Sequence, residues 1–347
     1  MLFFLGTYTK NTGSQGIYAL RLNPATGALS EPIVAAAATD PNWIELSPDR
    51  KYLYAVHAST AQALAFSVDL GTGRLTPFDP TSIAAAQPPS HLAVDATGRV
   101  LLSANYREGY VSASLIRADG TPGTPNSTRH EGSGPDPKRQ DKPHVHSVTV
   151  SPDNRFVVVA DLGLDKIFVY ALETSTATLT LVSSVAATQP GGGPRHFKFS
   201  RDGRFGYSIE EMGGTVTAYT WDAARGILTP IQTISTLPPD FAGLKWNAEV
   251  RIHPNGKFLY ASNRTHDSIA VFSIEPKTGF LMLIEIVPSG GKTPRNFALS
   301  GDGRWLVCGH QDEAIVTVFA VDEATGRLRK TAHSAAVPAV VCVVFAE

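Results

Sequence analysis

One phrase recurs six times along the chain and limits its fold more than any other feature. Each copy joins two apolar runs through a short polar turn: LSPDRKYLYAV, VDATGRVLLSA, VSPDNRFVVVA, FSRDGRFGYSI, IHPNGKFLYAS and LSGDGRWLVCG. The copies stand roughly 50 residues apart, which is the spacing expected of propeller blades. Apolar residues alternate at period two, and no long stretch follows the 3.6-residue period of a helix. The sequence therefore predicts an all-β protein built of repeats.

A second phrase, an acidic or polar turn of the form TG-L, follows most copies. It is seen in NPATGAL, DLGTGRL, EPKTGFL and DEATGRL. The six copies leave FFLGTYT and GIYALRLN at the start and VPAVVCVVFA at the end, and neither part is a whole blade. Because closing the ring removes its exposed edges, we expect the C-terminal strand to pair with the N-terminal ones. The prediction is a single domain, residues 1–347, folded as a seven-bladed β-propeller rather than one of six or eight blades.

A long insert interrupts the repeat at about residues 118–142. It reads ADGTPGTPNSTRHEGSGPDPKRQDK and is rich in glycine, proline and charge. We expect an irregular loop, and a loop of that length is either disordered or functional.

The charge balance favours a small ligand over a polymer. The chain has 30 Lys and Arg residues against 31 Asp and Glu, so no overall basic field attracts nucleic acid or an anionic membrane. The opening MLFFLGTYTK lacks a signal-peptide pattern, and no run approaches the roughly 20 apolar residues of a membrane span. We expect a cytoplasmic protein, a monomer or weak homo-oligomer, without a cofactor. Cys308 and Cys342 lie in apolar runs and are interpreted as buried thiols.

Two sets of positions differ from blade to blade, whereas a purely structural repeat would place interchangeable residues there. They precede the first strand and follow the second strand of each repeat, so the blades aim them at one end of the central channel. The first set is Asn42-Trp43, Ser90-His91, His146-Ser147, Arg195-His196, Ala248-Glu249, Arg295-Asn296 and Ala339-Val340. The second set is His57-Ala58, Asn105-Tyr106, Asp161-Leu162, Glu210-Glu211, Asn263-Arg264 and His310-Gln311. Converging titratable groups of this kind are typical of a ligand site.

The arginines and the acid in these sets suggest an anion site. Arg195 and Arg264, with Arg295 behind them, suit a phosphate or carboxylate through bidentate donors. Glu211, close to those cations, would be ionised and could act as a general base toward water or a carbon acid.

The histidines suggest proton transfer rather than metal binding. His146 and His196 could donate to a developing oxyanion or relay protons. KPHVHSV places His144 and His146 on one side of a strand, which a metal could use, but no third ligand follows at a recognised spacing. We predict no metal site.

Several stretches together resemble a known family. They are FLGTYTKNTGSQGIYALRLNPATG, HEGSGPDPKRQDKPHVHSV, ADLGLDKIFVY, GGGPRHFKF, WNAEVRIHPNGKFLYASNR and TPRNFALSGDGRWL. The resemblance runs nearly end to end and is to the bacterial lactonase family of seven-bladed propellers. That family includes a propeller type of 6-phosphogluconolactonase and the carboxy-cis,cis-muconate cyclase. The resemblance implies a metal-independent enzyme that works on a lactone ring or its acyclic acid.

The family motifs can be carried onto this chain. HxH falls on His144 and His146, GPRH on Arg195 and His196, NE on Glu211, NR on Arg264, AExR on Glu249 and the later PR on Arg295. We therefore predict catalytic roles for Glu211, His146, His196, Arg195 and Arg264. The predicted substrate-binding residues are His144, Arg295, Glu249, His91, Asn263 and Gln311.

The chain departs from the family pattern at two positions. Glu210 replaces the usual Asn before the catalytic-type Glu, and His57 replaces the Asn expected after the first YAV. A second acid beside Glu211 is expected to raise the pKa of Glu211 and weaken anion binding.

Three functions remain open on sequence grounds. The first is hydrolysis of a sugar lactone, above all 6-phosphogluconolactone, a small anionic substrate. The second is a 3-carboxy-cis,cis-muconate cycloisomerase, in which a substrate carboxylate adds to its own double bond. The third is a propeller scaffold that binds partners and catalyses nothing.

Overall fold

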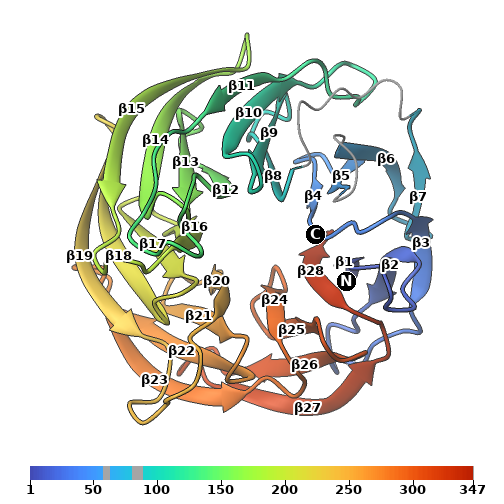
Figure 1. The fold of residues 1–347 in the computed structure, drawn as a ribbon. Helices are drawn as coiled ribbons and strands as arrows, with labels where there is room; N and C mark the ends of the chain where they lie inside the picture. The colour runs from blue at the N-terminus through green and yellow to red at the C-terminus, as the bar shows by residue number, and fades with distance from the viewer. Residues whose placement is uncertain (58–62, 80–88, 347) are drawn as a thin grey trace.

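The computed structural model describes residues 1–57, 63–79 and 89–346, and these form a ring of seven antiparallel four-stranded sheets. The sheets are arranged around a central channel like the blades of a propeller (Figure 1). The predicted fold class is confirmed. Each blade has its first strand at the channel and its fourth strand at the rim.

The blades are numbered from the first complete repeat. Blades 1 and 2 contain β4 (Ile44–Leu46), β5 (Tyr52–Val56), β6 (Ala63–Asp69), β7 (Arg74–Pro77), β8 (His91–Val94), β9 (Val100–Asn105), β10 (Tyr110–Leu115) and β11 (Asn126–Arg129). Blades 3 and 4 contain β12 (Val145–Val150), β13 (Phe156–Asp161), β14 (Lys166–Glu173), β15 (Thr178–Ala186), β16 (Pro194–Phe199), β17 (Phe205–Glu210), β18 (Thr215–Asp222) and β19 (Ile227–Ser235). Blades 5 and 6 contain β20 (Asn247–Ile252), β21 (Phe258–Asn263), β22 (Ser268–Ile274), β23 (Leu281–Pro288), β24 (Pro294–Leu299), β25 (Trp305–His310), β26 (Val316–Val321) and β27 (Leu328–Ala335). Blade 7 contains β28 (Val340–Phe345), β1 (Leu2–Thr7), β2 (Gly16–Arg21) and β3 (Ile33–Ala37).

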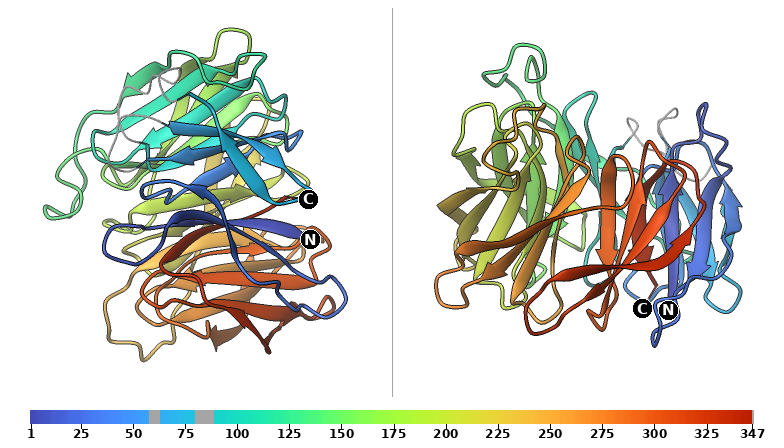
Figure 2. Two further views of the ribbon diagram at one scale, coloured as in Figure 1. Left: turned by 90° about the vertical axis from the view of Figure 1, so that its right-hand side faces the viewer. Right: turned by 90° about the horizontal axis from the view of Figure 1, so that it is seen from below.

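The two ends of the chain close the ring, as predicted. β28 pairs antiparallel with β1, with Phe3 opposite Phe345 and Leu5 opposite Val343. The termini lie side by side in all three views (Figures 1 and 2). Since β28 supplies the inner strand of blade 7, that blade has no unpaired edge at the channel.

The recurring polar turn is held by its own side chains. In blade 4, Ser200 Oγ donates to Asp202 Oδ1 at 2.7 Å and accepts from Phe205 N at 3.0 Å. Gly203 has a φ of 68°, a left-handed conformation that glycine adopts without strain. Arg204 then reaches the next blade, where its Nη2 donates to Pro276 O at 2.6 Å. The repeated phrase therefore builds a turn and also joins neighbouring blades.

In three of the four TG-L turns, the glycine packs against an aromatic ring of the preceding blade. A Cβ on Gly279 would lie 2.4 Å from Cδ1 of Phe205, and the Gly279 carbonyl accepts from Tyr207 OH at 3.0 Å. The same close approach pairs Gly27 with Trp305, Gly120 with Tyr52, Gly226 with Phe156 and Gly326 with Phe258. Both sequence phrases thus meet at the interface between blades.

The prediction that residues 118–142 form an irregular loop is partly wrong. Residues 126–129 of it form β11, the fourth strand of blade 2, which pairs with β10 from Tyr110↔Arg129 to Ala113↔Asn126. The alternating pattern is hard to recognise there because all four residues of β11 are exposed and polar. The green segment that follows β11 rises from the face of the ring opposite the termini (Figure 2).

Within the described ranges, no helix has the length and apolar character needed to span a membrane.

Replacing Gly279 by Ala tests the contact between blades. We expect G279A to lower the free energy of unfolding by about 2–4 kcal/mol, from left-handed strain and from the clash with Phe205. Gly256 has the same φ of 75° but no atom within 4 Å of its would-be Cβ, so G256A should cost only about 1–2 kcal/mol. Denaturant unfolding of both variants measures the difference. If both variants lose the same free energy of unfolding, the contact between Gly279 and the Phe205 side chain contributes nothing to stability.

Candidate active site

A pocket of about 370 Å³ opens at the mouth of the central channel. Its described lining comes from six of the seven blades and the loops between them: Tyr8, Asp40, Asn42, Trp43, Pro89, Ser90, Tyr106, Arg107, Arg139, His146, Arg195, His196, Glu211, Trp246, Arg264, Arg295, Asn296 and Val341. This volume is within the range of small-molecule sites.

β-Bulges at the pocket end of the inner strands aim extra side chains into this space. The pairing register shifts between Val145 and Ser147 in β12, between Pro194 and His196 in β16, and between Pro294 and Asn296 in β24. The bulged residues are His146, Arg195 and Arg295, and all three line the pocket. A bulge re-aims a side chain, so Arg195 and His196 can both face the pocket although they are adjacent on one strand.

The carboxylate of Glu211 is the centre of the site. Its Oε2 lies 2.9 Å from Arg195 Nε and 2.8 Å from Arg264 Nη2. Its Oε1 accepts from Arg139 Nη2 at 2.6 Å and from Trp246 Nε1 at 3.0 Å. Four donors from separate parts of the chain therefore converge on one carboxylate.

Two opposing effects set the pKa of Glu211. Burial alone would raise it, but the charges of Arg264 and Arg195 outweigh burial and hold the pKa well below its ordinary value. Glu211 is therefore ionised at neutral pH, and both of its oxygens are occupied by donors.

Backbone contacts fix two of the guanidinium groups further. Arg195 Nη1 donates to Ala248 O at 2.7 Å, and Arg264 Nη2 donates to Asn247 O at 2.9 Å. Arg264 also stacks 4.1 Å from the ring centroid of Trp246. Arg195 Nη2 and Arg264 Nη1 make no hydrogen bond to any described residue, so they are available to a ligand.

His146 lies beside this cluster. Its Nε2 is 3.8 Å from Glu211 Oε2, which is too long for a hydrogen bond but suits a group bound between them. Burial, followed by the charge of Arg195, lowers the pKa of His146 well below its ordinary value. The ring is thus neutral at physiological pH and able to accept a proton.

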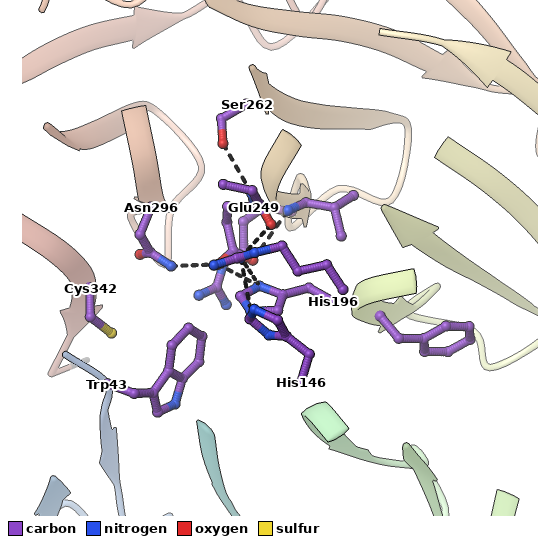
Figure 3. A network of polar contacts seen from close by, with 12 residues as sticks. Trp43, His146, His196, Glu249, Ser262, Asn296 and Cys342 are labelled. Atoms are coloured by element: carbon purple, nitrogen blue, oxygen red, sulfur yellow. Dashed lines mark hydrogen bonds and ion pairs between the residues drawn. The ribbon is translucent and has the colours of Figure 1, made fainter. Parts of the chain in front are cut away.

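His196 connects the pocket to a carboxylate deeper in the channel. Arg195 Nη1 lies 3.1 Å from His196 Nε2, and because a guanidinium can only donate, Nε2 accepts and Nδ1 carries the proton. His196 Nδ1 is 3.1 Å from Glu249 Oε2, which also accepts from Asn296 Nδ2 (Figure 3). The backbone N–H of Glu249 donates to Ser262 Oγ at 3.0 Å (Figure 3).

Further charges lie below Glu249 in the channel. Arg251 Nε is 3.3 Å from Glu249 Oε1. Burial lowers the pKa of Lys198 to about 8, and burial raises the pKa of Glu45 to about 7. These groups have opposite signs and balance one another, in contrast to the pocket.

The pocket itself carries an excess of positive charge. Its described lining includes five arginines and two carboxylates, which leaves an excess of three. Arg295 contacts Gln311 Oε1 at 3.2 Å and the Tyr8 ring at 5.7 Å, and no described carboxylate is within ion-pair distance of it. This excess suits an anionic ligand.

Unsatisfied polar atoms also gather here. Asn42 Oδ1, His146 Nδ1 and Arg264 Nε are buried without a hydrogen-bond partner, and all three residues line the pocket. Since such atoms are rare in folded proteins, their concentration at one place is typical of a binding site.

The predicted site residues separate into two groups. Glu211, His146, His196, Arg195, Arg264 and Arg295 come together at the pocket. The other five lie outside its described lining: His144, His91, Glu249, Asn263 and Gln311. Two of them stack on aromatic residues of the lining: the ring centroids of His144 and Tyr106 are 4.4 Å apart, and those of His91 and Trp43 are 3.9 Å apart. Glu249 contacts His196, and Gln311 contacts Arg295. Asn263 is hydrogen-bonded to Thr236.

Sequence reasoning missed several lining residues. Arg139 comes from the insert, which has no counterpart in the other repeats and cannot be aligned with them. Trp246 lies one residue before β20, just outside the compared positions. Tyr106 and Trp43 belong to the compared sets, but the sequence analysis assigns no role to either aromatic side chain.

The expected effect of Glu210 is wrong. Its Oε1 accepts from Ser208 Oγ at 2.5 Å within the blade, whereas Glu211 faces the pocket. Burial, with a smaller contribution from Asp165, raises the pKa of Glu210 to about 7. Glu210 is not among the charges that shift the pKa of Glu211, which is lowered rather than raised.

Among the described side chains, no group of three or more His, Cys, Asp or Glu residues is placed to hold a metal ion.

Comparisons with known proteins agree with the geometry. A family model described as a lactonase with a seven-bladed β-propeller matches residues 2–345. The 6-phosphogluconolactonase of Bacillus subtilis (strain 168) is 34% identical over 345 residues, covering 99% of this chain and 97% of that protein. A 6-phosphogluconolactonase of Formosa agariphila is 32% identical and covers 94% of each chain. The solved structure of a periplasmic gluconolactonase from Pseudomonas aeruginosa superimposes with a TM-score of 0.91, at 31% identity and full coverage of both chains.

Replacing Glu210 by Gln should change the pH dependence of stability. Burial raises the pKa of this carboxyl to about 7 in the folded protein, whereas its ordinary pKa, which applies in the unfolded chain, is 4.5. Folding stability therefore falls as the pH rises from 4.5 through 7. We expect E210Q to be more stable than the wild type at pH 8, by up to about 3 kcal/mol, and nearly equal to it at pH 4.5. Denaturant unfolding at both pH values measures this, and a stability gain that is the same at both would contradict it.

Proposed function

The chain belongs to the family of seven-bladed β-propeller lactonases, and from this we propose that it hydrolyses an anionic sugar lactone, 6-phosphogluconolactone being the foremost candidate. The observation that carries the proposal is the cluster of arginines around Glu211 at the channel mouth. Two relatives are named for this phosphorylated lactone. The scaffold function loses its support, because family membership indicates an enzyme.

The charge of the pocket supports an anionic substrate. A phosphate ester brings about two negative charges at neutral pH, and the lining has an excess of three positive ones. Arg295 adds to the positive charge available to the phosphate, because it has no carboxylate partner among the described residues. Free donors on Arg195 and Arg264 then remain for the lactone ring of the substrate.

We also propose the cytoplasm as the cellular compartment, although one relative is named as periplasmic.

In our proposed mechanism, His146 activates the water. Glu211 is a poor candidate for the base because four donors occupy its two oxygens, whereas Nδ1 of His146 has no hydrogen-bond partner. Neutral His146 can take a proton, and the nearby Glu211 carboxylate stabilises the imidazolium that forms. Water held by His146 adds to the lactone carbonyl carbon and transfers its proton to the ring nitrogen.

The arginines stabilise the charge that develops. Attack turns the carbonyl oxygen into an oxyanion, which Arg195 Nη2 and Arg264 Nη1 can bind without reorganising. The bond between the carbonyl carbon and the ring oxygen then breaks, and the ring oxygen takes the proton back from His146. The products are the open-chain hydroxy acid, ionised at neutral pH, and one proton released to solvent. No step requires a metal ion or another cofactor.

A direct assay tests the reaction. Purified protein, treated with a chelator, is mixed with freshly generated 6-phosphogluconolactone, and release of 6-phosphogluconate is followed after subtracting spontaneous hydrolysis. We expect turnover that the chelator leaves unchanged. Loss of turnover that returns when a metal ion is added back would contradict the metal-free mechanism, and no rate above the spontaneous one would contradict the substrate.

The variant His146→Gln tests the base. We expect kcat to fall by about 10²–10⁴-fold with little change in KM, because the variant keeps a polar group but cannot accept the proton. A low pKa for His146 also means that the wild-type kcat stays level from pH 8 to 6.5 and falls only at lower pH. A variant with nearly wild-type kcat would remove His146 from the mechanism.

One observation favours a second candidate function. The pocket has aromatic walls from Trp43, Tyr106 and Trp246 beside its cations, and these suit a flat diene with carboxylates. The reaction would be cyclisation of 3-carboxy-cis,cis-muconate. Loss of diene absorbance on mixing this compound with the enzyme, at a rate above that for the phosphorylated lactone, would favour it.

A further inference from the structure

Residues 130–144, called the arm below, run from the end of β11 to the start of β12. One carboxylate holds both ends of the arm. Asp161 Oδ2 is 2.6 Å from His130 Nδ1, and Asp161 Oδ1 accepts from His144 N at 2.8 Å. The other ring nitrogen of His130 is 2.8 Å from Tyr170 OH. All four side chains are buried, so the arm is anchored in blade 3.

The middle of the arm is fixed by a second buried group. Gln140 has no exposed surface, its Nε2 donates to Leu162 O at 2.8 Å, and its Oε1 accepts from Asp136 N at 3.0 Å. Asp136 Oδ1 in turn accepts from the backbone N–H groups of Lys138 at 2.8 Å and Arg139 at 3.2 Å. The backbone on both sides of Arg139 is therefore held in place.

These contacts place the Arg139 side chain at the outer side of the pocket. Its Nη2 donates to Glu211 Oε1 at 2.6 Å and to Tyr106 OH at 3.2 Å. Its Nε and Nη1 have no partner among the residues described. The side chain is 37% exposed, compared with 3% for Arg195 and 2% for Arg264, so it meets an incoming ligand before they do.

We propose that the arm is a fixed support that supplies Arg139 to the charged group of the substrate, and that Arg139 makes the enzyme prefer anionic lactones over uncharged ones. This inference rests on the proposed lactonase function. Nη1 of Arg139 offers two N–H groups and Nε offers one, on separate edges of the guanidinium, while Nη2 stays on Glu211 and Tyr106. Gln140 and Asp161 are positioning residues for Arg139.

Lys138 provides a matched control. It is the neighbouring cation on the same arm, but it lies on the outer surface with Pro135 and Pro190 rather than in the pocket. Lys138→Met and Arg139→Met remove the same charge at nearly the same place along the chain. A difference between them therefore reports contact with the ligand and not the general field of the protein.

The test measures kcat and KM on three substrates: 6-phosphogluconolactone, the same lactone without its phosphate, and a lactone that carries a carboxylate. We expect R139M to lose about 10- to 100-fold in kcat/KM on the phosphorylated lactone, chiefly through KM, and K138M to lose almost nothing. Because R139M also removes a donor from Glu211, activity on the uncharged lactone should fall too, but much less than activity on the phosphorylated one, so the preference for the charged lactone should drop; K138M should leave both activities unchanged. If R139M loses as much kcat/KM on the carboxylated lactone as on the phosphorylated one, Arg139 binds anions in general. If it loses less on the carboxylated lactone, Arg139 is specific for phosphate.

Two results would overturn the proposal. One is an R139M variant that keeps the wild-type preference for charged over uncharged lactone. The other is a K138M variant that loses as much as R139M does.

Gln140→Ala tests the positioning role. On its own, Q140A should reproduce much of the R139M loss on the phosphorylated lactone. In combination with R139M it should add little, because the arginine that it positions is already absent. Full additivity of the two losses would mean that Gln140 acts on something other than Arg139.

Binding of the product separates this proposal from the proposed function. Calorimetric titration with 6-phosphogluconate and with gluconate requires no turnover. Suppose that the wild type hydrolyses no lactone but binds 6-phosphogluconate, and that R139M weakens this binding while K138M does not. The lactonase proposal would then be wrong and the proposed role of Arg139 would be supported. If the wild type hydrolyses the lactone but R139M binds the product as tightly as the wild type, the lactonase proposal would be supported and the role of Arg139 would be wrong.

Discussion

The pocket depends on the pairing of one buried carboxylate with several cations. Glu211 is nearly inaccessible to solvent, as are Arg195 and Arg264, and burying any one of these charges without the others would cost free energy. Removing one partner from such a set typically costs about 3–5 kcal/mol, because the other charges stay buried without compensation. The same pairing that keeps these groups inside also aims their remaining N–H groups. Glu211 thus orients the donors, and both of its oxygens are occupied in doing so. In the proposed mechanism it is therefore His146 that accepts the proton.

In the propeller, the residues that join the blades and the residues that line the pocket lie in different places. Contacts between blades repeat: a turn glycine meets an aromatic ring, and a turn arginine reaches a carbonyl of the next blade. These contacts lie at the turns and outer strands, away from the channel mouth. The inner strand ends are therefore free to carry a different side chain in every blade. β-Bulges in β12, β16 and β24 use this freedom, since each adds one residue that faces the pocket without disturbing the rest of its sheet.

Most of the fold and much of the site could be predicted from the sequence because both follow from the repeat. Period-two alternation identifies the strands, and alignment of the copies assigns an angular position to residues such as Arg195 and Arg264. Arg139 could not be found this way, because its segment has no counterpart in the other blades. Glu210 was misjudged because two adjacent residues at a strand end can face opposite sides, and the sequence does not say which faces the pocket. Glu249 was assigned to the substrate for the same reason, although it lies behind His196.

The balance of charge in the two layers of the channel shows what the pocket is built to bind. Below His196, the cations Lys198 and Arg251 face the carboxylates Glu45 and Glu249, so that layer is nearly neutral. At the mouth, the cations of the described lining exceed the carboxylates by three. Burial lowers the pKa of Arg195 and Arg264, Glu211 raises it, and the charge of Arg295 lowers it, so the arginines repel one another and Glu211 offsets part of that repulsion. An anion relieves that repulsion and is bound more tightly for it. This charge balance supports the proposal that the ligand of the pocket is an anion.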